Sequence, residues 1–273
     1  MREGAGVSDR DDTATADFDR PNAARIHDWL LGGTLNTPID RDAAATALTR
    51  APALRELARA GRTFLHRAVQ HMLDAGIRQF LDLGAGLPTM TPTHRIAHRH
   101  DPAIPVVYVD HDPATTARTN LLLDDTPTAL GIHADLRHPD RVLDHPDTRR
   151  LLHPTQPTGL LAVDILDTLP DHDRPGRVLQ HYLDALPSGS IVALTHLTAW
   201  PLVDTAASGD IDHPSADWWR RHPRTTATVH SWLTRLTPLQ PDTAILHTDH
   251  VDTASTAAPN TAATVVTVLG RTT

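Results

Sequence analysis

One stretch decides the fold of this chain: Gln79-Phe80-Leu81-Asp82-Leu83-Gly84-Ala85-Gly86-Leu87-Pro88-Thr89. Its first half is a short run typical of a buried strand, and its second half places two glycines where that strand would turn into a helix. Glycines at such a turn let the backbone approach a ligand closely, because they carry no side chain. The stretch therefore predicts the first strand of an α/β domain, with a nucleoside-binding site at its carboxyl end.

Strand-like runs and helix-length segments alternate after this stretch. We expect strands at Gln79–Leu83, Val106–Asp110, Leu130–Ala134, Leu160–Ile165 and Ser190–His196. We expect helices at Pro92–His100, Pro113–Leu123, Pro139–Leu152 and Asp173–Leu186. This alternation predicts about five parallel strands joined by crossover helices. Two later runs, Thr243–His250 and Ala263–Gly270, predict antiparallel strands at one edge of the sheet.

Helices are expected before the stretch as well. Apolar residues at helical intervals predict a helix over Pro21–Leu31, a second helix from about Asp40, and a third from Pro52 to Gly76. Residues 1–19 are polar and acidic and are expected to form a mobile tail. We therefore expect a helical extension or lid over residues 20–76 and an α/β domain over residues 77–273, folded together as one structural unit.

The composition excludes several kinds of chemistry. The 273 residues include no cysteine and no lysine, which excludes disulfides, cysteine nucleophiles, Schiff-base lysines and a Walker-type phosphate lysine. His94 and His98 are one helical turn apart, but no HExxH glutamate accompanies them, so we expect no metal site. A formal charge of −8 argues against a nucleic-acid partner. Without an apolar run of membrane-spanning length or a secretory signal, we expect no membrane partner and a cytoplasmic location.

Aspartates stand at the ends of three successive expected strands. Asp110 follows Gly86 by 24 residues, near the offset of about 20 at which dinucleotide-binding folds carry an acceptor for ribose hydroxyls. Asp82 would face the amino group of a methionine moiety, and Asp135 would accept a hydrogen bond from an adenine amine. The competing interpretation is that these aspartates only cap strand ends and helices. Thr89 stands where a dinucleotide fingerprint has a third small residue, which disfavours a nicotinamide cofactor.

With these motifs in place, the chain resembles the actinobacterial S-adenosylmethionine-dependent methyltransferases once catalogued as a domain of unknown function. The resemblance rests on the motifs Pro21–Gly33, Asp82–Thr89, Val107–Pro113, Ala134–Arg137 and Leu186–Ser190. It implies a Rossmann-like class I methyltransferase of the α/β class, with a mostly parallel seven-stranded sheet flanked by helices and an N-terminal helical extension. It also implies S-adenosyl-L-methionine as the cofactor. The chain departs from the family pattern at Asp167-Thr168, where relatives usually carry His-Phe.

The expected site combines both parts of the chain. The cofactor-binding residues are Asp82, Gly84, Gly86, Asp110, His111 and Asp135 from the α/β domain, with Arg25, Asp28 and Gly33 from the N-terminal motif. For the N-terminal residues the alternative is a helix surface that ends at an ordinary glycine stop. Candidate general bases are Asp164, Asp167 and His196, at the ends of the fourth and fifth strands. The alternative for these three is a cap or a core position.

The resemblance and the strand-end residues together favour one function over two others. We expect methyl transfer from S-adenosylmethionine to a small-molecule acceptor, which the sequence does not identify. The first alternative is a non-catalytic S-adenosylmethionine-binding protein, such as a sensor or partner subunit, and the altered Asp167-Thr168 segment favours it. The second is an NAD-dependent oxidoreductase. The sequence leaves the oligomeric state open, with a homodimer as one option.

Overall fold

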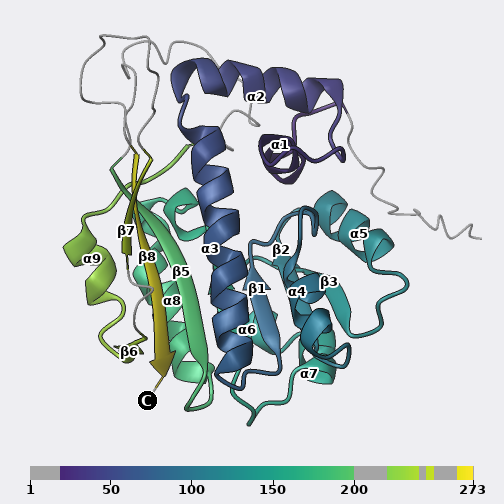
Figure 1. Cartoon of the computed structure of the whole chain (residues 1–273), viewed down its shortest axis with the longest axis vertical. Helices are drawn as coiled ribbons and strands as arrows, with labels where there is room; N and C mark the ends of the chain where they lie inside the picture. The colour runs from purple at the N-terminus through teal and green to yellow at the C-terminus, as the bar shows by residue number, and fades with distance from the viewer. Residues whose placement is uncertain (1–18, 200–219, 240–243, 249–262, 273) are drawn as a thin grey trace, which may run out of the picture.

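The computed structural model describes residues 19–199, 220–239, 244–248 and 263–272 (Figure 1). Its centre is a sheet in the order β3-β2-β1-β4-β5-β8-β6, with β7 also paired to β8. The five parallel strands are β1 (Phe80–Leu83), β2 (Val106–Asp110), β3 (Ala129–His133), β4 (Gly159–Ala162) and β5 (Ile191–Ala199). The strand order reverses between β1 and β4, and open α/β sheets bind ligands at such a point.

The remaining strands close one edge of the sheet. β8 (Ala263–Thr272) runs antiparallel to β5. The far edge of β8 pairs with β6 (Leu236–Pro238) over its last residues and with β7 (Ala244–Thr248) over its first residues. β6 and β7 therefore share one position in tandem, which gives the seven strand positions and the antiparallel edge that the sequence predicts. The other residues of the expected strand Thr243–His250 lie outside the described residues, as do residues 1–18 of the expected tail.

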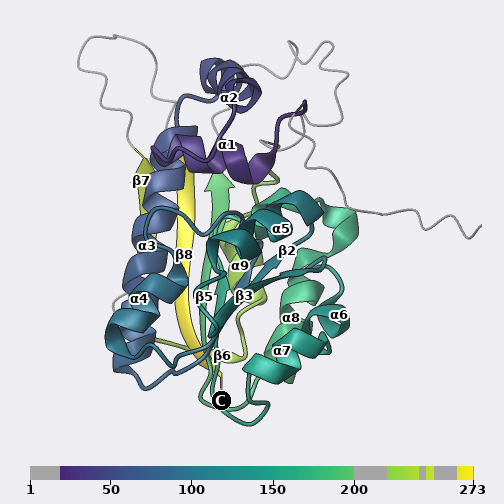
Figure 2. The ribbon, with the colours of Figure 1, turned by 90° about the vertical axis from the view of Figure 1, so that its right-hand side faces the viewer.

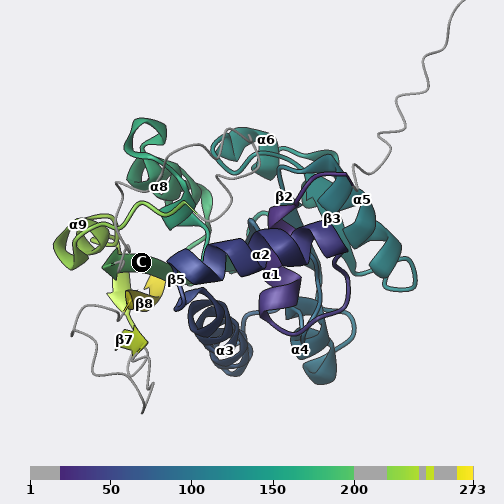
Figure 3. The same cartoon turned by 90° about the horizontal axis from the view of Figure 1, so that it is seen from above.

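Helices cover both faces of the sheet (Figures 1 and 3). Those that follow β1 are α4 (Thr93–His100), α5 (Pro113–Leu122), α6 (Pro139–Leu143), α7 (Pro146–Leu151), α8 (Pro175–Ala185) and α9 (Thr226–Ser231). On one face, α3 and α4 share a buried core with Phe80 and Leu161 of the sheet. On the other face, α6, α8 and α9 share a core with Leu81 and Leu160. Alternate strand residues thus point to opposite faces, and both faces are buried.

Three N-terminal helices precede the sheet, and the first two lie at the carboxyl ends of the parallel strands. They are α1 (Ala23–Leu30), α2 (Pro38–Arg50) and α3 (Leu54–Asp74). The apolar stripe of α3 lies on the sheet, whereas α1 and α2 lie across the top of the strands (Figures 1 and 2). Ile26 and Leu30 of α1 pack against Ala44 of α2 and Ala58 of α3, so the three helices share a small core of their own.

Proline and aspartate explain where the elements differ from expectation. The expected helix Pro139–Leu152 is divided into α6 and α7, because His145 precedes Pro146 and takes an extended ψ of 133°. β4 ends at Ala162 instead of Ile165, because Asp164 has φ +57° and a short 3-10 turn follows. α2 begins at Pro38, before Asp40. Asp40 is the third residue of the helix and forms its capping box with Thr37.

Other boundaries shift by a few residues, and one strand was not expected. β5 runs on to Ala199 along β8, with a bulge after Leu197. α8 begins at Pro175, after a 3-10 turn over Asp171–Asp173. The short strand β6 was not predicted. Among the described helices, none combines the length and apolar character that a membrane span requires.

Candidate functional site

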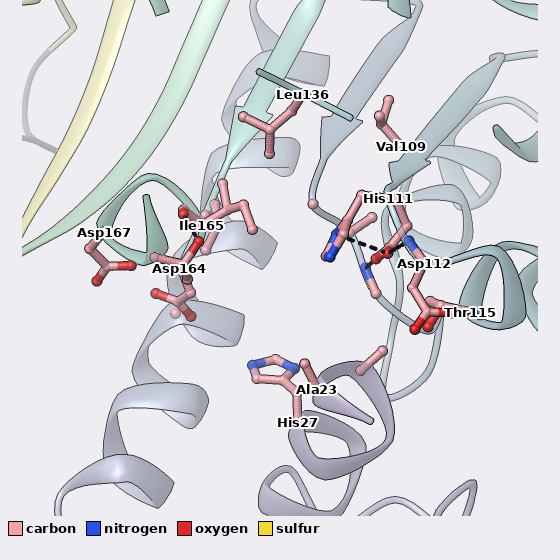
Figure 4. Close-up of a pocket in the computed structure, with 18 of the residues that line it drawn as sticks. Ala23, His27, Val109, His111, Asp112, Thr115, Leu136, Asp164, Ile165 and Asp167 are labelled. Atoms are coloured by element: carbon pink, nitrogen blue, oxygen red, sulfur yellow. Dashed lines mark hydrogen bonds and ion pairs between the residues drawn. The ribbon is translucent and has the colours of Figure 1, made fainter. Parts of the chain in front are cut away.

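A cavity of about 710 Å³ opens at the carboxyl ends of β1, β2 and β4, next to α1 (Figure 4). Its volume falls within the range of roughly 300–1,000 Å³ that is common for small-molecule sites. Figure 4 shows Asp164 and Asp167 on one side and His111, Asp112 and Thr115 on the other, with His27 of α1 below the space between them. The cavity therefore spans the point where the strand order reverses.

The turn after β1 contributes its backbone to this cavity. Gly84 and Gly86 both have φ +62°, a conformation that favours glycine. A Cβ on Gly84 would overlap Ile165, which follows β4. A Cβ on Gly86 would stand 3.4 Å from Ala24 Cβ of α1. Both glycines are therefore needed for conformation, and Gly84 also for the close approach of Ile165.

Asp110 at the end of β2 fastens this turn. Its Oδ2 accepts a hydrogen bond from the Gly86 N–H (3.0 Å), and its Oδ1 accepts one from the Asp112 N–H (2.9 Å). Burial raises the pKa of Asp110 above its ordinary value. Each carboxylate oxygen has a second lone pair, so the group can still accept hydrogen bonds from ligand hydroxyls. The neighbouring His111 side chain is exposed, with Nδ1 3.7 Å from Asp110 Oδ1, and it lines the cavity.

Asp82 lies deeper, on β1. It is 5% exposed, and its Oδ2 accepts a hydrogen bond from Thr93 Oγ1 (2.7 Å) at the start of α4. Burial raises the pKa of Asp82 to about 6. Tyr108 lies nearby on β2, and its hydroxyl is held by the backbone N–H and the ring Nδ1 of His94, both at 2.8 Å. Asp82 is thus a rigidly held carboxyl group on the floor of the cavity.

Asp135 follows β3 and lines the outer part of the cavity. Its Oδ2 accepts hydrogen bonds from Arg137 Nη2 (2.7 Å) and Nε (2.9 Å). Burial alone would raise the pKa of Asp135, but the hydrogen bonds from Arg137 hold it below its ordinary value. Arg137 Nη1 also donates to Asp173 Oδ2 (3.1 Å), which ties this loop to the segment before α8. The carboxylate therefore faces the cavity in its charged form.

Asp164 and Asp167 follow β4. The backbone N–H of Asp164 donates to Thr195 Oγ1 (2.7 Å), and the hydroxyl of Thr195 donates to Asp164 Oδ1 (2.9 Å). A Cβ on Gly61 of α3 would overlap Asp164 Oδ2, so this helix leaves room for the carboxylate. Burial, and then the charge of Asp167, raise the pKa of Asp164 to about 6.

Asp167 is 6% exposed, and its buried Oδ1 has no hydrogen-bond partner among the described residues. The nearest cationic atom recorded for it is Arg221 Nε, at 3.7 Å. The main-chain oxygen of Asp167 accepts a hydrogen bond from the His222 N–H (2.7 Å), which holds the segment around residue 221 against the cavity. The two sequence-predicted carboxylates therefore stand together at the inner end of the cavity.

The structure does not bring three of the expected cofactor residues to the cavity. Arg25 Nε donates to Asp40 Oδ2 (2.7 Å), which joins α1 to α2. Asp28 is 1% exposed, and its Oδ2 accepts a hydrogen bond from the Leu35 N–H (2.8 Å). A Cβ on Gly33 would overlap the Asp28 carboxylate. Arg25, Asp28 and Gly33 thus build the turn between α1 and α2, and none of them lines the cavity.

His196 also lies elsewhere. Its ring is fully buried, with Nδ1 2.8 Å from the Leu197 main-chain oxygen and Nε2 3.2 Å from Arg224 Nη1. It packs edge-on against Trp232, at 5.3 Å between ring centroids. Burial lowers the pKa of His196. The residue belongs to the packing between β5 and the segment around α9, and it is not among the residues that line the cavity.

Two further residues line the cavity: His27, which belongs to the N-terminal motif, and Arg62, which we did not assign from the sequence. His27 projects from α1, its Nε2 is buried without a hydrogen-bond partner among the described residues, and burial together with Arg62 and Arg221 lowers its pKa to about 3. Arg62 projects from α3 and makes no hydrogen bond or ion pair within the described part of the chain. One signal was available: Arg62 interrupts the apolar stripe of α3, four residues after Ala58 and three before Leu65.

Comparison with known proteins adds the family. A family model described as S-adenosyl methyltransferase matches residues 9–273. The chain belongs to this family. Its cofactor is therefore S-adenosylmethionine, as the resemblance implies. Among the described residues, no group of three or more histidine, aspartate or glutamate side chains forms a metal site.

Two crystal structures of similar proteins support the same assignment. A DUF574 family protein from Streptomyces avermitilis is 30% identical, with a TM-score of 0.77, over 94% of this chain and all of that one. A candidate methyltransferase from Thermobifida fusca is also 30% identical, with a TM-score of 0.76, over 94% of this chain and 97% of that one. They confirm the class I methyltransferase fold with its N-terminal helices. Among proteins of curated function, none matches the chain.

Proposed function

We propose that the chain transfers the methyl group of S-adenosylmethionine to a small-molecule acceptor bound at the inner end of the cavity. One observation carries this proposal. The same cavity of about 710 Å³ contains Asp110 at the end of β2, the glycine turn after β1, and the two carboxylates Asp164 and Asp167 after β4. The cofactor and its acceptor can therefore share a single enclosed space, which displacement at the methyl carbon requires.

The residues present fit the cofactor. Asp110 would accept hydrogen bonds from the ribose hydroxyls, since both of its oxygens are oriented by backbone N–H groups and keep free lone pairs. Gly84 and Gly86 line the cavity, and their backbone would lie against the adenosine. Asp135 would accept from the adenine amine, and the buried carboxylate of Asp82 would face the methionine amino group.

Arg62 would bind the methionine carboxylate. Its guanidinium carries a full charge, lines the cavity and has no partner in the described structure, an arrangement that an anionic ligand group would complete. Its charge disfavours protonation of His27 and opposes the rise in pKa that burial causes at Asp82 and Asp164, which places Arg62 near these side chains. Arg62 is thus near the carboxylates that suit the cationic groups of the cofactor.

The chemistry requires little from the protein beyond positioning. When bound, S-adenosylmethionine supplies a methyl group on a positively charged sulfur. The cavity walls would hold the acceptor atom in line with that methyl group and exclude water. Asp164 and Asp167 are placed to remove a proton from the acceptor, and the pKa of Asp164, about 6, leaves it ionised at neutral pH. His196 has no part in this proposal, because it lies outside the cavity.

Calorimetry on the full chain tests the cofactor assignment. We expect S-adenosylmethionine and S-adenosylhomocysteine to bind and NAD not to bind. Asp110→Asn should weaken both adenosyl ligands roughly 10- to 100-fold, because hydrogen bonds to a charged group are lost. Thermal unfolding of the variant would show that its fold is retained. Failure of the wild-type chain to bind either adenosyl ligand would overturn the proposed function.

A second pair of variants tests Arg62. Arg62→Met should weaken S-adenosylhomocysteine roughly tenfold or more and leave adenosine affinity unchanged, because adenosine has no carboxylate. Arg59→Met is the matched control, since Arg59 is an exposed arginine on the same helix. Equal losses for both ligands in Arg62→Met would show that the residue does not bind the methionine carboxylate.

A further inference from the structure

The charges around the cavity are strongly unbalanced. Among the described residues, its lining includes seven aspartates and three arginines, with no glutamate. The aspartates are Asp82, Asp110, Asp112, Asp135, Asp164, Asp167 and Asp173, and the arginines are Arg62, Arg137 and Arg221. The cofactor brings a sulfonium and an ammonium group with one carboxylate, so it offsets only part of this negative charge. A cationic acceptor would offset more of it.

Two of these carboxylates, Asp164 and Asp167, lie together at the inner end of the cavity. Asp164 uses Oδ1 to accept from Thr195, and its Oδ2 has no hydrogen bond in the described structure. Asp167 is 94% buried, and its Oδ1 lacks a hydrogen-bond donor there as well. A buried carboxylate oxygen without a donor costs free energy unless a ligand supplies the donor. Asp167 Oδ1 is such an oxygen, and together with Asp164 Oδ2 it would suit a ligand group with several N–H bonds.

His27 lies opposite this pair and does not supply the missing cation. Its pKa of about 3 keeps the ring neutral near neutral pH. Its buried Nε2 has no partner among the described residues, so the ring offers a further polar contact to a bound ligand. Figure 4 shows the ring below the space that Asp164 borders. The polar groups at this end thus come from α1 and from the segment after β4.

Apolar side chains line the same part of the cavity. Leu57 of α3, Leu197 of β5 and Val265 of β8 all border it, and they form one packed cluster. A ligand that reached this end would therefore bury an apolar body against the three side chains while its polar head met the carboxylates. A sugar or another highly hydroxylated molecule would leave its hydroxyl groups against these walls without partners.

We propose that the methyl acceptor is an amine with an apolar body, whose nitrogen binds between Asp164 and Asp167 and whose body packs on Leu57, Leu197 and Val265. This inference rests on the proposed function. The ammonium group loses one proton to the Asp164 carboxylate. The freed nitrogen lone pair then forms the bond to the methyl carbon while the carbon–sulfur bond breaks, and the sulfur keeps that electron pair. The products are the methylated ammonium ion and the thioether S-adenosylhomocysteine.

Binding of matched probes to the complex with S-adenosylhomocysteine tests this proposal without turnover. The probes are 2-phenylethylamine, 2-phenylethanol and phenylacetate, with hexylamine, 1-hexanol and hexanoate as a second set. Calorimetry on the full chain saturated with S-adenosylhomocysteine should show each amine binding at least about tenfold more tightly than its alcohol, with the carboxylates weakest. Amines that bind no better than the alcohols, or that do not bind, would overturn the proposal.

Charge-removing variants locate the binding group. Asp167→Asn should abolish the preference for amines and leave S-adenosylhomocysteine affinity within about twofold, because the acceptor and not the cofactor would face this residue. Asp42→Asn, an exposed aspartate of α2, is the control and should change neither value. If Asp167→Asn instead removes S-adenosylhomocysteine binding, the residue serves the cofactor and the amine assignment is wrong. If the wild-type chain does not bind S-adenosylhomocysteine, the proposed function itself fails.

Discussion

Asp164→Asn should make the protein more stable at neutral pH while it impairs the site. Burial and the neighbouring charge of Asp167 raise the pKa of Asp164 from 3.8 to about 6, so the fold disfavours the charged form of this carboxyl group. Asparagine is nearly isosteric, tolerates the φ of +57°, and keeps an oxygen for the hydroxyl of Thr195. The substitution therefore removes the charge and leaves the local geometry intact.

The pKa shift gives both the magnitude and the pH window. Because the pKa is higher in the folded chain than in the unfolded one, the folded state binds the proton more tightly, and this contribution to stability is complete below pH 3.8. It is lost as the pH rises through about 6. A rise in the pKa from 3.8 to about 6 corresponds to about 3 kcal/mol. The variant avoids this loss, so its advantage over the wild type should grow from about 2 kcal/mol at pH 5 to about 3 kcal/mol at pH 8.

Urea unfolding of the ligand-free chain at pH 5, 6, 7 and 8 measures this advantage. These values are upper limits, since water that enters the cavity solvates the charged carboxylate. Asp42→Asn should show no pH-dependent gain, because Asp42 is exposed. A gain that is constant with pH, or that shrinks towards pH 8, would refute the reasoning that a buried charge is the cause. The same variant should lose methyl transfer to amines if Asp164 accepts the proton.

Two further predictions concern the helices that cover the cavity. Gly61→Ala should displace the Asp164 carboxylate, because the new Cβ would overlap its Oδ2. Methyl transfer should fall at least about tenfold while S-adenosylhomocysteine affinity is retained. An unchanged kcat would argue against the contact. Asn22→Ala should remove the hydrogen bonds from Asn22 Nδ2 to Asp112 Oδ2 (2.8 Å) and Thr115 Oγ1 (3.3 Å), together with the N-cap of α1. The free energy of urea unfolding should fall by about 1 kcal/mol, and S-adenosylhomocysteine affinity should fall about fivefold. Unchanged values would show that this link is not needed.

The strand-end part of the cavity could be predicted from the sequence because the topology of the sheet fixes where the strands end. Parallel strands end at one edge of the sheet, so Asp82, Gly84, Asp110 and Asp135 were expected to meet, and all four line the cavity. His196 shows the limit of this reasoning. Successive strand residues point to opposite faces, so Thr195 reaches Asp164 while the next residue points into the core beside Trp232.

The resemblance places the N-terminal motif in the site, but the sequence does not show which face of the first helix points to the cavity. Residues 24 and 27 lie on one face of α1 and line the cavity, whereas Arg25 and Asp28 lie on the adjacent face and bond to α2 and to the turn that follows α1. A sequence motif identifies residues that matter together without saying which of them meets a ligand. The strand β6 was missed because three residues carry too little periodicity to predict.

The position of α1 has a consequence for the timing of turnover. Ala24 faces Gly86 across the space that a Cβ on Gly86 would fill. One carboxylate, that of Asp40, accepts hydrogen bonds from Arg25 of α1 and from the N–H of Asn22. The two helices beside the proposed cofactor site are therefore braced against each other and do not form a loose flap. Release of S-adenosylhomocysteine past this face would require α1 and α2 to move together, a step whose rate would be independent of how readily the methyl group moves.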